Sequence, residues 1–156
     1  MATQTVDFQD ILYDVRPEGV ARITINRPDK YNAFRAETVE ELIHAFQTAG
    51  WDKSISVIVL TGAGDKAFCT GADLKERSGR TTADMVHDRH YVIPKFTVAV
   101  ASVSKPVIAA INGTCVSGGL EFAMAADVRI AAAGAKFGYP DTKLGLIPAI
   151  GGTVQL

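Results

Sequence analysis

The stretch Val107-Ile-Ala-Ala-Ile-Asn-Gly-Thr-Cys-Val-Ser-Gly-Gly-Leu-Glu121 decides how the fold of this chain is interpreted. Residues 107–111 form an apolar run of the length expected for a buried strand. Asn112-Gly113 has the composition of a turn, and helix-compatible sequence begins at Gly118-Gly119. The stretch therefore predicts a strand, a turn and a helix, with the two glycines at the N-terminus of the helix.

This predicted helix start combines two chemical groups that are useful in catalysis. The first-turn N–H groups of a helix have no internal partners and lie at the positive end of its dipole. Glycine lets a substrate approach the backbone closely, and the carboxylate of Glu121 follows on the same element. One stretch thus offers an oxyanion donor and a possible general base. Alternatively, it is a plain strand-turn-helix unit whose glycines permit close packing and whose Glu121 favours the helix N-terminus.

The amino-acid composition excludes several classes of protein and of partner. The chain has 156 residues, of which 47% are hydrophobic and 21% charged, so we expect one soluble domain over residues 1–156. The net charge of −1 and the lack of a Lys/Arg cluster argue against a nucleic-acid partner. No leader-like N-terminal pattern and no long apolar run is present, which predicts a cytoplasmic protein without a membrane partner. Cys69 and Cys115 lack metal-ligand spacing, so we expect reduced, buried thiols and no metal site.

Short strands and helices alternate along the chain, which predicts an α/β fold. Thr38 and Glu41 have the spacing of a capping box and predict the start of an amphipathic helix that ends at Gly50. A helical segment over residues 83–103 is expected to kink or divide at Pro94. The expected strands lie at residues 8–13, 20–25, 56–60, 107–111 and 128–132, with a short one ending near residue 137.

Two further segments carry polar chemistry. In residues 66–76, Gly71 precedes a polar segment that begins a helix, which makes it a second candidate oxyanion donor. Asp141 follows a proline in a loop and by itself suggests a turn or cap residue. His87 and His90, one helical turn apart, are interpreted as solvated side chains because no third ligand is near in sequence.

Taken together, these segments resemble the crotonase (enoyl-CoA hydratase/isomerase) superfamily, and their order and spacing cover nearly the whole chain. The matching motifs are Asn26-Arg27-Pro28 with Asn32-Ala33, Ala67-Phe68 with Gly71-Ala72-Asp73-Leu74-Lys75, Lys105 to Ala110, Gly118-Gly119 with Glu121 and Ala123-Met124, and Phe137-Gly138 through Leu144-Gly145, Ile147-Pro148 and Gly151-Gly152.

The resemblance implies a spiral of strand-strand-helix units that binds an acyl-CoA thioester and assembles into trimers or hexamers. It implies that the N–H groups of Ala72 and Gly118 hold the thioester oxygen, and that Glu121 and Asp141 hold and activate a water molecule. The segment Ala72-Asp73-Leu74-Lys75 is expected to contact the substrate along the CoA passage. No separate cofactor is implied, because coenzyme A enters as part of the substrate.

Three departures from the family pattern affect these expectations. Asp141 stands where the hydratases usually have Glu, and Ser117 stands where the family often has a third glycine. The resemblance covers only the core of the family fold, so we expect a core domain without the C-terminal helical segment. Hydration of a 2-enoyl-CoA is the leading expectation. Double-bond isomerisation, thioester hydrolysis and a non-catalytic or truncated CoA-ester-binding domain are the alternatives.

Overall fold

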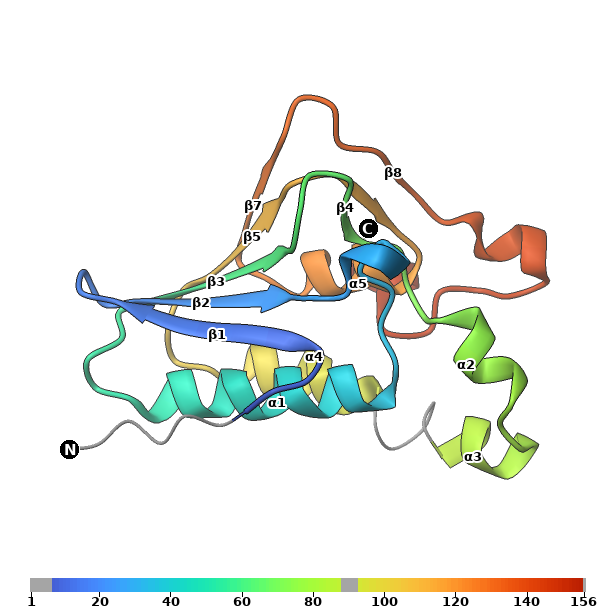
Figure 1. Cartoon of the computed structure of the whole chain (residues 1–156), viewed down its shortest axis with the longest axis horizontal. Coiled ribbons are helices and arrows are strands. Elements are labelled where there is room, and N and C mark those ends of the chain that lie inside the picture. Colours follow the sequence, from blue (N-terminus) through green and yellow to red (C-terminus); the bar gives the residue numbers. More distant parts are fainter. Residues whose placement is uncertain (1–6, 88–92, 156) are drawn as a thin grey trace.

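The structure is a computed structural model that describes residues 7–87 and 93–155 (Figure 1). Short strands alternate with helices, as the sequence predicted. The strands are β1 (Ile11–Arg16), β2 (Val20–Ile25), β3 (Val57–Gly62), β4 (Ala67–Cys69), β5 (Val107–Ile111), β6 (Thr114–Val116), β7 (Val128–Ala131) and β8 (Phe137–Gly138). The helices are η1 (Pro28–Lys30), α1 (Ala36–Trp51), α2 (Leu74–Ser78), α3 (Thr82–His87), α4 (Ile93–Ala101), α5 (Gly118–Met124), η3 (Pro140–Leu144) and α6 (Gly152–Gln155).

The strands form two sheets, and from β3 onward successive strands belong alternately to the larger and to the smaller sheet. The larger sheet has the order β1-β2-β3-β5-β7, and all its pairs except β1 with β2 are parallel. The smaller sheet has the order β4-β6-β8 and is parallel throughout. Each strand pair β3–β4, β5–β6 and β7–β8 places one strand in each sheet before a helical segment follows. This repetition is the spiral of strand-strand-helix units that the resemblance implied.

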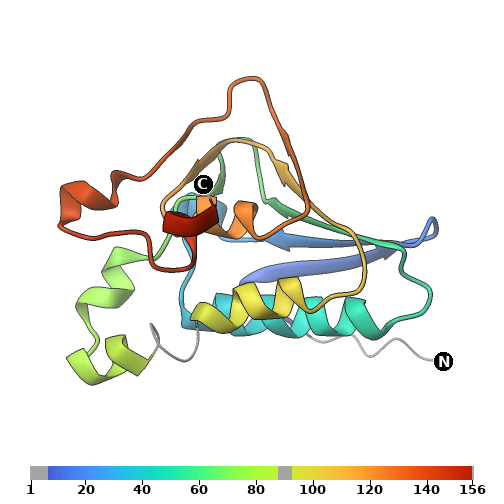
Figure 2. The same cartoon turned by 180° about the vertical axis from the view of Figure 1, so that it is seen from behind.

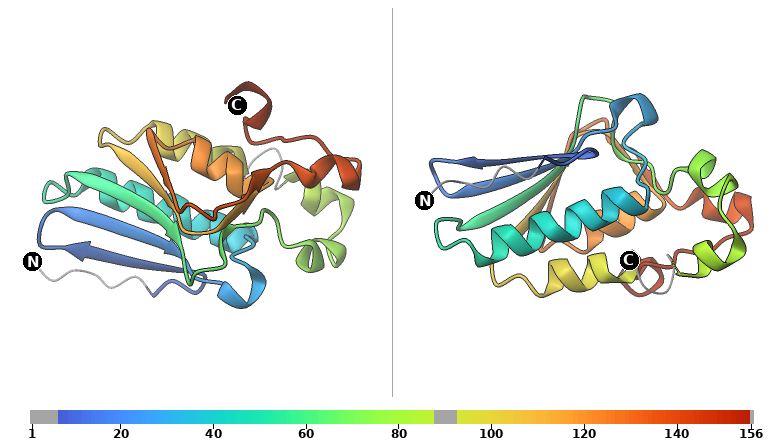
Figure 3. Two further views of the ribbon diagram at one scale, coloured as in Figure 1. Left: turned by 90° about the horizontal axis from the view of Figure 1, so that it is seen from above. Right: turned by 60° about the horizontal axis from the view of Figure 1, so that its bottom comes forward.

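Two helices cover one face of the larger sheet. In Figures 1 and 2, α1 and α4 lie side by side against this sheet, and Figure 3 shows the same arrangement from two other sides. Alternate residues of β3 and β5 are buried, which is the pattern of strands with a packed face. The ring of Phe46 on α1 meets that of Phe96 on α4 at a centroid distance of 5.8 Å. The core therefore lies between this helix pair and the sheet.

The start of α1 differs from the sequence prediction. The helix begins at Ala36 with Arg35 as its N-cap, two positions before Thr38. The Thr38 hydroxyl accepts a hydrogen bond from the Arg35 N–H (3.1 Å) and donates one to buried Asp10. Glu41 accepts hydrogen bonds from the N–H groups of Gln9 and Asp10 (2.6 and 2.9 Å). The predicted capping box was wrong because both side chains bind the segment before β1.

The region predicted to be helical over residues 83–103, with a kink or division at Pro94, contains two helices, α3 and α4. Pro94 is the second residue of α4, a first-turn position where its missing N–H breaks no helical hydrogen bond. His90 lies outside the described residues, and so does the junction between the two helices.

The two cysteines are free and buried, as expected, and burial raises the pKa of both thiols to about 12. Across the described ranges, every helix is too short or too polar to cross a membrane.

The N-terminal strand is attached to α1 through buried Asp10. Its carboxylate accepts hydrogen bonds from Arg35 Nε and Nη2 (2.7 and 3.1 Å), and Arg27 Nε lies 3.6 Å away. Burial alone would raise the pKa of Asp10, but the hydrogen bonds from Arg35 and Thr38 and the two arginine charges hold the pKa below 3.8. This attachment is therefore strongest when the Asp10 carboxyl group is ionised.

We expect Asp10→Asn to lower the free energy of unfolding at neutral pH by about 2 kcal/mol, because it removes a charged acceptor of several hydrogen bonds. The stabilisation in the wild type is complete above pH 3.8 and is lost as the pH falls through the lower pKa of the folded state. The difference between the two proteins in urea unfolding should thus shrink below that pH. Asp14→Asn, which alters an exposed pair with Arg22 (2.8 Å), is the control and should cost less than about 1 kcal/mol. Equal losses for both variants would contradict the assignment.

Candidate active site

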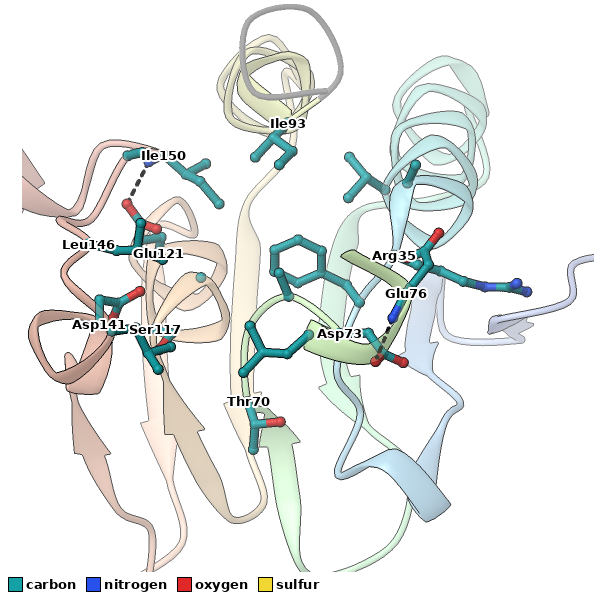
Figure 4. Close-up of a pocket in the computed structure, with 18 of the residues that line it drawn as sticks. Arg35, Thr70, Asp73, Glu76, Ile93, Ser117, Glu121, Asp141, Leu146 and Ile150 are labelled. Carbon is teal, nitrogen blue, oxygen red and sulfur yellow. Dashed lines mark hydrogen bonds between the residues drawn. The ribbon is translucent and has the colours of Figure 1, made fainter. Parts of the chain in front are cut away.

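A pocket of about 260 Å³ lies beside the turns that precede Ala72 and Gly118 (Figure 4). The start of α1 and the segment after β8 also line it. Apolar side chains supply much of its wall: Phe34, Val39, Leu74, Ile93, Leu144, Leu146, Ile147 and Ile150. Glu121 and Asp141 lie on the same side of the pocket, and Asp73 and Glu76 lie across from them. The pocket thus brings carboxylates from three separate segments into a largely apolar space.

Glu121 is a buried carboxylate with a defined orientation. It lies in the first turn of α5 and is 3% exposed. Its Oε1 accepts hydrogen bonds from the N–H groups of Ile150 (2.6 Å) and Gly152 (2.9 Å). Burial raises the pKa of Glu121, the negative charge of Asp141 adds to this, and the two N–H groups oppose it. Glu121 is therefore held in one place and has an increased affinity for a proton, as a general base requires.

Asp141 lies in η3, directly after Pro140, and its carboxylate reaches the pocket beside Glu121. Its Oδ2 is buried and has no hydrogen-bond partner among the described residues. A buried carboxylate oxygen without a hydrogen-bond partner destabilises the folded state. We therefore expect Asp141 Oδ2 to form a hydrogen bond with water or with a ligand. The charges of Glu121 and Asp141, together with burial as the largest cause, raise the pKa of Tyr139 to about 12. The neutral phenol thus lies next to two acidic groups.

Two residues that line the pocket, Ala72 and Gly118, have backbone N–H groups without a partner among the described residues. In the described part of the chain, neither the N–H of Ala72 nor that of Gly118 donates a hydrogen bond to a protein group. Gly118 is the first residue of α5, where such N–H groups lack helical partners. The two turns touch, since a Cβ on Gly71 (φ +94°) would lie 3.2 Å from the Gly118 nitrogen. The arrangement can hold one oxygen atom between two donors.

The structure brings most of the sequence-predicted site residues together. Six of them line the pocket: Ala72, Asp73, Leu74, Gly118, Glu121 and Asp141. Lys75 is exposed and does not line it, so its predicted contact with substrate stays a prediction. Asp73 lines the pocket, but its carboxylate is occupied by Arg27 and by the first N–H groups of α2. The roles assigned to these seven residues remain predictions.

Ser117 has a backbone conformation that explains the family preference for glycine. Its φ of +52° and ψ of −134° lie outside the regions that residues with a side chain normally occupy. The N–H of Ser117 donates to the Gly138 carbonyl (3.0 Å), which ties this strained residue to β8. The Gly118 N–H belongs to the peptide group that follows this strained residue. The direction of that N–H is therefore set by the conformation of Ser117.

Sequence reasoning missed the groups that orient the site. The N–H groups of Ile150 and Gly152 hold Glu121, yet Gly151-Gly152 had been assigned no task. Arg27 binds Asp73, although Asn26-Arg27-Pro28 had been noted only as a motif. Backbone donors and ion pairs between distant residues produce no periodic pattern in the sequence. Only the family motifs that contain these residues could have pointed to them. No group of three or more potential metal ligands occurs among the described side chains.

The fold has strand pairs that alternate between two sheets, and its pocket places two carboxylates beside two backbone N–H groups that have no partner among the described residues. The model of the family described as enoyl-CoA hydratase/isomerase matches residues 15–156, and the chain belongs to this family.

Individual relatives agree with this assignment. A short-chain-enoyl-CoA hydratase of Clostridium acetobutylicum is 40% identical over 139 residues, which are 88% of this chain and 52% of the relative. A crotonyl-CoA hydratase of Syntrophomonas wolfei is 36% identical over 149 residues, 96% of this chain and 56% of the relative. The crystal structure of an enoyl-CoA hydratase from Bacillus anthracis matches with a TM-score of 0.89 and 39% identity, covering 94% of this chain and 57% of that one. The chain thus spans about half the length of the curated relatives it matches.

Proposed function

We propose that this protein adds water to the double bond of a 2-enoyl-CoA thioester. The proposal is carried by one observation: two carboxylates, Glu121 and Asp141, share a pocket wall beside two backbone N–H groups that have no partner among the described residues. Relatives that are named as hydratases of short 2-enoyl-CoA esters support it.

In the proposed reaction, the thioester oxygen lies between the N–H groups of Ala72 and Gly118. These donors stabilise the enolate-like charge that develops there, and a single donor of an oxyanion hole is worth about 3 kcal/mol. Ionised Glu121 takes a proton from the water as its oxygen bonds to the β-carbon. The α-carbon receives a proton on the same face, so that one water molecule is added in all and Glu121 returns to its ionised state. Asp141 is proposed to hold this water beside Glu121.

Other features belong to the same proposal. Coenzyme A enters with the substrate and no resident cofactor takes part, because enolate stabilisation and proton transfer need only the groups described. Leu74 and Lys75 lie beside the Ala72 donor and are proposed to contact the CoA portion of the substrate. Asp73 is proposed to contact it through its backbone alone, because its carboxylate is occupied by Arg27 and the start of α2. A homo-trimer or hexamer and a cytoplasmic location are proposed from family membership.

The test is to follow the absorbance of the conjugated enoyl-thioester while purified protein is incubated with crotonyl-CoA, and to identify the product by mass. A gain of one water at an intact thioester supports hydration. Release of free coenzyme A would replace the proposal with thioester hydrolysis. Turnover of a 3-enoyl-CoA to its conjugated isomer without a mass change would replace it with isomerisation. Binding of these esters without turnover would replace it with a non-catalytic domain.

The pH dependence should reflect the environment of Glu121. The base acts only when ionised, so kcat/KM falls as the pH drops through its pKa. Because burial raises this pKa, the acid limb should have its midpoint above 4.5, the ordinary value for glutamate. Measuring kcat/KM for crotonyl-CoA from about pH 4 to pH 8 checks this. An acid limb centred at or below 4.5 would mean that another group is the base.

A further inference from the structure

Hydrogen bonds on both sides hold the peptide group that carries the Ala72 N–H. Phe34 donates its N–H to the Gly71 carbonyl (2.9 Å) and accepts one from the Asp73 N–H (2.8 Å). The C=O of Gly71 and the N–H of Ala72 belong to one trans peptide and point in opposite directions. When Phe34 fixes the carbonyl of Gly71, it therefore directs the Ala72 N–H away from Phe34.

Arg27 holds both sides of this contact. Its Nη2 donates to Asp73 Oδ2 at 3.1 Å, and its Nη1 donates to the Ala33 carbonyl, directly before Phe34. The Arg27 and Asp73 side chains are only 15% and 13% exposed. One guanidinium group thus joins the residue before Phe34 to the residue after Ala72. The same guanidinium lies 3.6 Å from Asp10 through its Nε.

Asp73 passes this restraint on to helix α2. Its Oδ1 accepts hydrogen bonds from the N–H groups of Lys75 (3.1 Å) and Glu76 (3.4 Å), as an N-terminal cap does. Both oxygens of the carboxylate are therefore occupied by protein groups. Burial alone would raise the pKa of Asp73, but the hydrogen bonds from Arg27, Glu76 and Lys75 lower it below its usual value. Asp73 is thus ionised at neutral pH, which keeps the charged pair with Arg27 intact.

We propose that the Arg27–Asp73 ion pair is the positioning device that aims the Ala72 N–H at the substrate oxygen, an inference that rests on the proposed function. Neither side chain has a chemical part in the reaction. Arg27 acts through Asp73 and Ala33, and these residues act through the backbone that flanks Ala72. Misplacing one donor leaves the fold and the pocket in place but weakens the hydrogen bond that is most needed as charge develops.

The inference can be tested with Arg27→Met, which keeps the length of the side chain without its charge, and with Asp73→Asn, which keeps a cap for α2 without its charge. Each protein binds butyryl-CoA labelled with ¹³C at the carbonyl, an ester that has no double bond to hydrate. Infrared difference spectra then report how far the carbonyl stretching frequency falls in the complex, which measures the hydrogen bonds to that oxygen. We expect a clear lowering in the wild type and a smaller one in both variants. The dissociation constant, measured by calorimetry, should change less than about threefold.

Turnover gives a second readout. With crotonyl-CoA, kcat should fall about tenfold or more in each variant with little change in KM, since the lost interaction strengthens only in the transition state. The double variant should lose no more than Arg27→Met alone, because both changes break one pair. Arg22→Met is the matched control, since its partner Asp14 (2.8 Å) lies on the β1–β2 hairpin and neither residue lines the pocket. It should behave as the wild type does.

The outcomes separate this inference from the proposed function. If the wild type lowers the carbonyl frequency and folded Arg27→Met and Asp73→Asn lower it equally, the ion pair has no positioning role. If the wild type binds butyryl-CoA without lowering the frequency, the oxyanion assignment itself is wrong, and the inference falls with it. If Arg27→Met does not fold, Asp73→Asn alone decides, because asparagine retains the cap of α2.

Discussion

Replacing Glu121 by glutamine is expected to lower kcat for hydration of crotonyl-CoA by about 1,000-fold. The amide is nearly the same size and still has an oxygen that can accept hydrogen bonds from Ile150 and Gly152. It cannot take a proton from water. Because burial disfavours the charged form of Glu121, the melting temperature of the variant should equal or exceed that of the wild type. Steady-state kinetics and thermal unfolding check these two expectations, and calorimetry with butyryl-CoA should show that binding is retained.

Glu41→Gln is the control for this variant. Glu41 also accepts two backbone N–H hydrogen bonds from a distant segment, those of Gln9 and Asp10, but it does not line the pocket. Its replacement should leave kcat within about twofold of the wild type. Turnover of Glu121→Gln at more than about a tenth of the wild-type rate would exclude Glu121 as the base.

Replacing Gly119 by alanine is expected to have the largest effect on stability, a loss of about 3 kcal/mol or more in the free energy of unfolding. A Cβ at this position would lie 2.1 Å from the Cys69 carbonyl oxygen and 2.6 Å from its carbonyl carbon. These are backbone atoms of β4, so they cannot move aside as a side chain would. The variant must separate α5 from β4, and urea unfolding measures the cost.

Gly134→Ala is the matched control, because a Cβ there would meet nothing within 4 Å. It should be neutral or stabilise by about 0.5 kcal/mol through the unfolded state. If Gly119→Ala cost less than about 1 kcal/mol, the close contact between α5 and β4 would be wrong. That contact also sets the spacing of the two proposed oxyanion donors, since Ala72 follows β4 and Gly118 begins α5.

The fold could be predicted where local pattern and burial agree. Residues 107–111 were predicted as a strand from their apolar run, and β5 has these bounds, with alternate residues buried in the core. Helix boundaries were less predictable. Thr38 and Glu41 have the spacing of a cap, but tertiary hydrogen bonds to residues 9 and 10 recruit both side chains, and α1 begins earlier. The resemblance implied the spiral of strand-strand-helix units. The division of the strands between two sheets was not predicted, since strand spacing alone does not distinguish one sheet from two.

Glu121 and the glycines before it could be predicted as a site because helix-start chemistry is local. Asp141 could not, since a loop carboxylate carries no signal of its own and its meaning depends on Glu121, 20 residues earlier in the sequence. The groups that hold the site residues in place could not be predicted from the sequence either. Ile150 and Gly152 hold Glu121 through backbone atoms, which every residue has, and the partner of Arg27 lies 46 residues away.

The N–H groups that hold Glu121 lie 29 and 31 residues further along the chain. As the protein is synthesised, α5 emerges before these donors, and its carboxylate must then be hydrated by water. Closing so long a connection is entropically slow compared with forming a helix or a hairpin. We therefore expect the hydrogen bonds to Glu121 to form late in folding, so that a refolding chain regains its helical circular dichroism before it regains the proposed activity.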